Sequence, residues 1–157
     1  MITYDELTAV LSGSGISKDV IQVFDEEYVL PTDGWITTKL GPALDKFFFD
    51  TGIKYGEDQY DCNKFAKTAS TIADWCWNKT KTENAALAFG MFAYLESGGH
   101  MINIAVHRDQ NSKLYLAFYE PQPSAPEDGT VIFKPICLTK RTLSTEDIQS
   151  CIACLFL

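Results

Sequence analysis

The chain has 157 residues, an ordinary length for one domain with a core of its own, and residues 1–157 are expected to form a single domain. Its net charge is −8 and no cluster of Lys or Arg stands out, which argues against nucleic acid or an anionic membrane surface as a partner. Of the five cysteines only Cys151 and Cys154 have a CxxC spacing, and no second pair completes a zinc pattern, so mostly reduced thiols are expected rather than a disulfide framework.

Helix-start signals predict three helices in the first third of the chain. Thr3 and Glu6 form a capping-box pattern ahead of an apolar-periodic run, and residues 17–24 form a second short run that begins at a serine. Residues 28–36 contain a proline and a glycine and are expected to form a loop. A third helix is expected over residues 38–50, with a proline near its start.

A fourth helix, predicted over residues 61–78, places Cys62 in its first turn. Asp61 is the natural N-cap, and apolar residues then recur at helical spacing. Unpaired backbone N–H groups and the positive end of the helix dipole favour a thiolate there, which is the reactive form of cysteine. The alternative is a small buried hydrophobe, but Cys62 lies between two polar residues, so it is the candidate nucleophile. The other four cysteines lie inside apolar runs: Cys76, Cys137, Cys151 and Cys154.

A β-hairpin is predicted after a buried strand over residues 85–95. Residues 100–107 and 113–120 alternate with the period of a strand, and the only turn-like stretch between them is centred on Gln110. His107 lies beside this turn on the other face of the hairpin and is expected to be exposed to solvent.

The predicted hairpin brings His100 to Glu120. Antiparallel partners lie symmetrically about the turn, so Val106 would face Leu114, and His100 would face Glu120 at the far end of the same face. The carboxylate can hold one imidazole nitrogen and leave the other for a nucleophile, as a general base requires. A purely structural His/Glu pair and a zinc site made from these two residues and Cys62 are the alternatives.

The last part of the chain is expected to complete an antiparallel sheet and to end in a helix. A proline-rich loop over residues 121–129 precedes a strand over residues 130–140, and Ser144 begins a closing helix over residues 144–157. The last four residues fit the C-a-a-X prenylation pattern, but no polybasic stretch precedes them, which favours the helix. Helices first and an antiparallel sheet second predict an α+β fold.

Three short segments carry a resemblance to a known superfamily. They are Asp-Cys-Asn-Lys-Phe-Ala around Cys62, Gly-Gly-His-Met-Ile-Asn around His100 and Phe-Tyr-Glu-Pro-Gln around Glu120. A helix-opening cysteine, a histidine at a strand start and an acid at the end of the next strand resemble the papain-like cysteine peptidases. The pattern is most similar to the papain-like domains of fungal lectins of the Marasmius oreades agglutinin type. The first segment also resembles the cell-wall amidases of the NlpC/P60 and CHAP families.

The resemblance implies a papain-like fold and a catalytic triad. Cys62 would attack a carbonyl group, His100 would accept and return the proton, and Glu120 would orient the imidazole. Gln122 and the backbone N–H of Cys62 are the candidate oxyanion donors. The expected reaction is hydrolysis of peptide or amide bonds, with a peptide or peptidoglycan as substrate. No cofactor is expected, calcium enters by the resemblance alone, and metal sites stay open.

The rival interpretation is a catalytically silent papain-like domain that serves as an assembly module, for instance in a homodimer. A complete triad is necessary for turnover and not sufficient, so the residues leave both interpretations open. This sequence has no signal peptide and no apolar run long enough to span a membrane, which favours the cytoplasm as its location.

Overall fold

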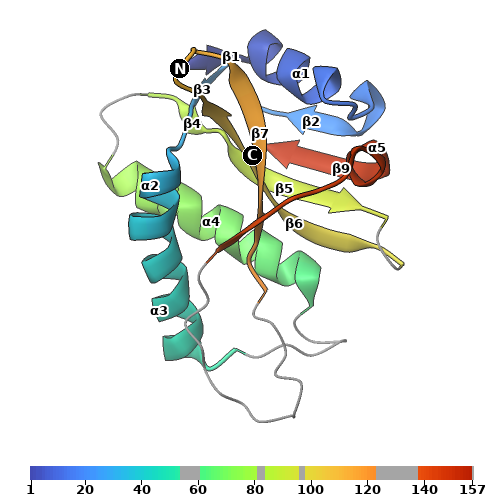
Figure 1. The fold of residues 1–157 in the computed structure, drawn as a ribbon. Coiled ribbons are helices and arrows are strands. Elements are labelled where there is room, and N and C mark those ends of the chain that lie inside the picture. The colour runs from blue at the N-terminus through green and yellow to red at the C-terminus, as the bar shows by residue number, and fades with distance from the viewer. Residues whose placement is uncertain (54–60, 81–83, 96–97, 123–137, 157) are drawn as a thin grey trace.

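The structure is a computed structural model that describes residues 1–53, 61–80, 84–95, 98–122 and 138–156 (Figure 1). A six-stranded sheet forms its centre. The long helix α4 (Cys62–Thr80) packs across one face of this sheet, and α1 (Tyr4–Gly13) packs on the other.

Local signals explain where several helical segments begin and end. Besides α1 and α4, the described helical segments are the 3₁₀ turn η1 (Lys18–Val20), α2 (Asp33–Trp35), the π-helical turn η2 (Ile36–Leu40), α3 (Gly41–Thr51) and α5 (Thr145–Gln149). The capping box ahead of α1 forms as predicted, because Thr3 Oγ1 accepts from the N–H of Glu6 and the Glu6 carboxylate accepts from the N–H of Thr3. Helix α3 carries Pro42 in its first turn and ends at Gly52, whose φ of 65° is left-handed.

The strands form two sheets. Their bounds are β1 (Ile2–Thr3), β2 (Ile21–Val23), β3 (Glu27–Val29), β4 (Ala86–Leu87), β5 (Phe89–Tyr94), β6 (His100–Arg108), β7 (Leu114–Glu120), β8 (Thr139–Arg141) and β9 (Cys151–Phe156). The larger sheet has the order β2-β9-β5-β6-β7-β8, and the smaller has the order β1-β3-β4. The pairs β2–β9 and β3–β4 are parallel, so the expected purely antiparallel sheet is replaced by mixed sheets.

Two hydrophobic cores lie on opposite faces of the larger sheet. Alternate residues of β6 such as Ile102 and Ile104 pack with α1 in one core. Residues of β6 that point to the opposite face, such as Ala105, pack with α3 and α4 in the other core. Because side chains alternate between the two faces of a strand, the same strand contributes residues to both cores.

Helix α4 meets the sheet through small residues. Ala66, Ala69 and Ala73 are fully buried, and Cys62 heads the same stripe because it precedes Ala66 by four residues. The helix predicted over residues 61–78 is confirmed, and it presents the candidate nucleophile at the point where its buried stripe ends.

Two N-terminal segments differ from the prediction. Residues 17–24 form η1 and then β2 rather than a helix, because the β-branched Ile21 and Val23 find a parallel partner strand in β9. The loop expected over residues 28–36 contains part of β3 and the whole of α2. The third helix is confirmed as α3, which directly continues η2.

The C-terminal segment also differs from the prediction. The capping box between Ser144 and Asp147 forms, but the helix ends at Gln149 and the chain continues as β9. Strand β9 inserts between β2 and β5 and gains backbone partners on both sides, which outweighs its helical spacing. The approach to β5 is close, because a Cβ at Gly90 would lie 2.2 Å from the carbonyl oxygen of Leu155.

Several predicted segments lie wholly or mostly outside the described residues. They are the loop at 51–60, the loop at 121–129, most of the strand at 130–140, and Cys137. The described end of that last strand does form β8. None of the helices in the described ranges is long and apolar enough to cross a membrane.

The hairpin of β6 and β7 forms in a register other than the predicted one. Val106 pairs with Leu116, so the expected pairing with Leu114 is wrong by two residues. Because side chains alternate with a period of two, this shift keeps every side chain on its predicted face.

The turn explains the shift in register. The backbone N–H of Asp109 donates to the carbonyl oxygen of Lys113 at 2.9 Å, so the turn is centred on Asn111 rather than Gln110. The Asp109 carboxylate also accepts from the N–H groups of Asn111 and Lys113, and Ser112 adopts a positive φ of 64°. An Asx-type turn therefore sets the register.

Candidate active site

His100 and Glu120 lie together at the ends of neighbouring strands. His100 is the first residue of β6, Glu120 is the last residue of β7, and His100 Nε2 lies 2.6 Å from Glu120 Oε2. The two side chains are 19% and 20% exposed. If the observed register is extended to the end of β7, Glu120 lies opposite Ile102, so His100 and Glu120 are diagonal neighbours on one face. The predicted contact is confirmed because diagonal side chains on one face are within reach of each other.

Two further groups hold the Glu120 carboxylate. Nη1 of Arg141, on β8, donates to Oε2 at 3.0 Å, and the backbone N–H of Gln122 donates to Oε1 at 3.1 Å. Both carboxylate oxygens are therefore fixed, and the guanidinium offsets part of the negative charge. Gln122 contributes here through its backbone, and the predicted oxyanion role of its side chain stays a prediction.

Arg141 is a residue of this cluster that the sequence analysis missed. It enters because β8 pairs with β7, with Phe118 directly opposite Arg141. Twenty-one residues separate Arg141 from Glu120, and no local pattern indicates that these two strands pair.

The imidazole of His100 has one nitrogen committed. Nε2 is held by Glu120, and the ring packs edge-on against Tyr94, its pairing partner on β5, with 6.0 Å between ring centroids. Among the described residues no hydrogen bond is recorded at Nδ1. Nδ1 is therefore the nitrogen that a nucleophile would meet, which is the arrangement of a general base.

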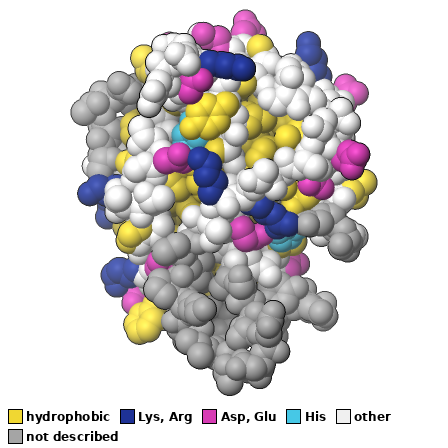
Figure 2. Space-filling view, in the orientation of Figure 1, with side chains coloured by type: hydrophobic (Ala, Val, Ile, Leu, Met, Phe, Trp, Pro, Cys, Tyr) yellow, Lys and Arg dark blue, Asp and Glu magenta, His cyan; other side chains and the backbone are white. Residues whose placement is uncertain are grey.

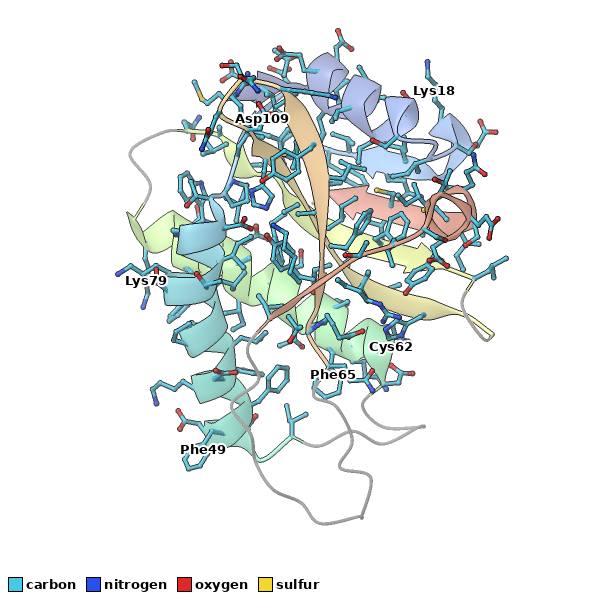
Figure 3. The ribbon with its side chains drawn as sticks, in the orientation of Figure 1. Lys18, Phe49, Cys62, Phe65, Lys79 and Asp109 are labelled. Atoms are coloured by element: carbon cyan, nitrogen blue, oxygen red, sulfur yellow. The ribbon has the colours of Figure 1, made fainter. Side chains whose placement is uncertain are left out.

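Cys62 is the first residue of α4 and lies at the labelled end of that helix in Figure 3. It is a half-buried free thiol. The carbonyl oxygen of Asp61 accepts from the N–H groups of Lys64 and Phe65, both at 3.1 Å, so the helix starts where the cap was predicted. Asp61 Oδ1 is buried and has no hydrogen-bond partner among the described residues. Within those residues no hydrogen bond joins Cys62 to His100 either, and their contact remains a prediction.

The other described cysteines are shielded thiols. Burial raises the pKa of Cys151 to about 11 and holds the pKa of Cys154 well above its usual range. Burial also raises the pKa of Cys76, on α4. At neutral pH these three thiols stay protonated.

The second histidine lies where the sequence analysis did not expect it. His107 is 3% exposed, so the prediction of a solvent-exposed side chain is wrong. Its Nδ1–H donates to the carbonyl oxygen of Pro31 at 2.6 Å, and Nε2 lies 2.8 Å from the hydroxyl of Tyr119. That hydroxyl donates to Asp33, whose other oxygen accepts from Lys140 at 2.9 Å. The prediction failed because α2 and the chain before it fold over β6, a contact between distant segments.

A pocket of about 600 Å³ lies near the other end of α4, beside β4. Its acidic lining residues are Asp25, Glu26, Glu27 and Asp74. Burial raises the pKa of Asp74 to about 6, and the charge of Asp25 adds to the effect. Asp74 is 12 residues along the helix from Cys62, or about 18 Å, so this pocket is separate from the candidate active site. Within the described residues, no group of three or more His, Cys, Asp or Glu side chains could hold a metal ion.

Comparisons with known proteins place the fold. No protein-family model matches the chain, and no curated protein matches it significantly. Among solved structures, the one described as "PSL1a-E64 complex" is similar, with a TM-score of 0.61 and 22% sequence identity. The match covers 77% of this chain and 44% of that chain, so this protein spans less than half the length of its structural neighbour. The likeness shows a papain-like α+β fold. The finer resemblance to fungal agglutinins stays a prediction.

Proposed function

We propose that this protein is a cysteine hydrolase that cleaves peptide or amide bonds. Cys62 is the nucleophile, His100 is the general base and acid, and Glu120 orients the imidazole. The observation that carries the proposal is the 2.6 Å bond between His100 Nε2 and Glu120 Oε2, with Nδ1 left for the thiol. The papain-like fold supports it, as does the complex of a structural neighbour with E64.

The proposed reaction proceeds through a thioester. The Cys62 thiolate attacks the carbonyl carbon, a C–S bond forms, and the carbonyl π electrons move onto the oxygen. The His100 imidazolium then gives its proton to the leaving amine as the C–N bond breaks. Water that is deprotonated by the same nitrogen hydrolyses the thioester and restores the thiol. The oxyanion is assigned to the backbone N–H of Cys62 and the side chain of Gln122.

Arg141 modifies the role of Glu120 in this mechanism. It shares Glu120 Oε2 with His100, so part of the carboxylate charge is already offset before the imidazole gains a proton. Glu120 therefore holds the ring in one tautomer and orientation, and it stabilises the imidazolium with the part of its charge that Arg141 does not offset.

The decisive variant is Cys62→Ala. Hydrolysis of casein or peptidoglycan, with and without added calcium, should be abolished, while the melting temperature stays nearly unchanged because a half-buried thiol at a helix start contributes little packing. Cys76→Ala is the matched control, since Cys76 is a half-buried thiol on the same helix and should be dispensable. Activity that survives Cys62→Ala would overturn the chemistry.

Thiol labelling provides a second, independent readout of the same proposal. At mildly acidic pH, iodoacetamide and E64 should modify Cys62 ahead of Cys76, Cys151 and Cys154, because burial keeps those three thiols protonated. Peptide mapping by mass spectrometry identifies the modified residue. A parent protein with no hydrolysis and no selective labelling of Cys62 would be the catalytically silent module.

A further inference from the structure

We infer that Asn103 is a positioning residue that sets Cys62 against His100, an inference that rests on the function proposed above. Asn103 is fully buried on β6. Its Nδ2 donates to the carbonyl oxygen of Ala66, on α4, at 2.9 Å and to that of Gly90, on β5, at 3.0 Å. One side chain therefore ties the helix that carries the candidate nucleophile to the strand that carries the candidate base.

Ala66 and Asn103, which this hydrogen bond joins, lie close in sequence to Cys62 and His100. Ala66 is four residues beyond Cys62 on the same stripe of α4, about 6 Å along the helix axis. Asn103 is three residues beyond His100 in β6, about 10 Å along the strand. The hydrogen bond fixes both the axial position and the rotation of the first turns of α4 relative to the start of β6. The distance from thiol to imidazole depends on these two quantities.

The anchor on β5 is itself rigid. Strand β5 lies between β6 and β9 in the sheet. A Cβ at Gly90 would lie 2.2 Å from the carbonyl oxygen of Leu155, so the two backbones are in close contact. The bond to Gly90 therefore holds the Asn103 amide against a closely packed part of the sheet, and the second amide hydrogen is directed at α4.

Stability alone does not account for an asparagine at this position. Asn103 Oδ1 is buried with no hydrogen-bond partner among the described residues, and an unpaired buried acceptor lowers the stability of the folded state. The next residue on the same face, Ala105, is a fully buried part of the apolar core. An apolar side chain of similar volume would fill the space without this cost, but it would give no directional contact to α4.

The test compares two substitutions of Asn103 with a neighbouring control. Asn103→Leu removes both donors and keeps the branched shape of the side chain, and Asn103→Ala removes both donors without adding volume. Ile104→Ala is the control, because Ile104 is the next residue of β6, fully buried in the core on the opposite face. The measurements are the melting temperature, kcat and KM on one peptide substrate, and the rate of alkylation of Cys62 by iodoacetamide against pH.

Both Asn103 variants should lower kcat by about tenfold or more, with KM changed by less than about threefold, because a small misplacement of reacting groups costs rate rather than binding. The fast alkylation of Cys62 at mildly acidic pH should fall to the rate of an ordinary exposed thiol. Ile104→Ala should lower the melting temperature and leave kcat and the alkylation profile unchanged.

Three outcomes overturn the inference in distinguishable ways. If both Asn103 variants keep the parent's kcat and alkylation profile, Asn103 does not position Cys62, and the proposed function stands. If Ile104→Ala loses as much kcat as the Asn103 variants, the effect is general loss of packing. If the parent shows neither hydrolysis nor fast alkylation of Cys62, the proposed function fails and the inference fails with it.

Discussion

The two histidines of β6 are seven residues apart and occupy contrasting environments. His107 is 3% exposed, and both of its ring nitrogens contact polar partners. His100 is 19% exposed, and Glu120 engages only its Nε2. Figure 2 shows histidine side chains at two places on one face, each beside acidic and basic side chains. An imidazole whose two nitrogens both have polar partners is suited to a structural role, whereas one with a free nitrogen can take part in proton transfer.

The acidic partners of the two histidines differ as well. Glu120 forms a direct hydrogen bond with His100. By contrast, the hydroxyl of Tyr119 lies between His107 and Asp33, and His107 Nε2 is 3.6 Å from Asp33 Oδ1. For His107, burial outweighs this charge and lowers the pKa. Both sites contain His, an acid and a cation, so the kinds of residue present do not separate the structural from the catalytic candidate.

Loss of the His100 imidazole should have the largest effect. His100→Ala should reduce kcat by about three orders of magnitude or more, because it removes the group that accepts and returns the proton in the proposed mechanism. The melting temperature should change by only a few degrees, since the side chain is partly exposed. Initial rates and a thermal melt test both statements, and an active His100→Ala variant would remove the basis of the comparison.

The same substitution at His107 should have the opposite effect. His107→Ala should lower the free energy of unfolding by about 2–4 kcal/mol, because it opens a cavity and leaves buried polar groups without partners. The kcat of the folded fraction should be unchanged. Urea unfolding and active-site titration measure these quantities. A loss of kcat like that of His100→Ala would show that both histidines take part in the reaction.

Glu120→Gln should have an intermediate effect. The amide can still hold the imidazole but cannot stabilise its positive charge, so kcat should fall by roughly 10- to 100-fold with the fold intact. Arg141→Met should lower kcat by less than Glu120→Gln does, since the Glu120 carboxylate stays in place. Steady-state kinetics of the two variants separate the roles, and a larger loss in Arg141→Met would contradict the order.

The smallest expected effect is a pH dependence of stability that comes from His107. Because burial lowers its pKa in the folded state from the ordinary value of 6.5, the unfolded chain binds a proton more readily. The free energy of unfolding should therefore fall as the pH drops below about 6.5, and it should fall less in His107→Gln. Urea unfolding at a series of pH values tests this, and equal slopes in the parent and the variant would contradict it.

In the hairpin of β6 and β7, the faces of the side chains could be predicted from the sequence, but the register could not. Alternation along β6 and β7 predicted that His100 and Glu120 share one face, and they do. The register was wrong by two residues because the turn is centred on Asn111, yet a shift of two leaves the faces unchanged. A shift of one would have separated the pair.

Features that depend on neighbours along the chain could be predicted from the amino-acid sequence alone. The capping boxes at Thr3 and Ser144, the start of α4 at Cys62 and the faces of the hairpin all follow from residues a few positions apart.

Features that depend on contacts between distant segments became visible only in the folded structure. Strand β9 replaced a predicted helix because it inserts between β2 and β5. Arg141 reaches Glu120, Asn103 reaches Ala66, and His107 is buried, each through such a contact. The physical reason is that the burial of a side chain and the pairing of a strand are settled by whichever distant surface covers them, and local patterns along the chain carry no information about that surface.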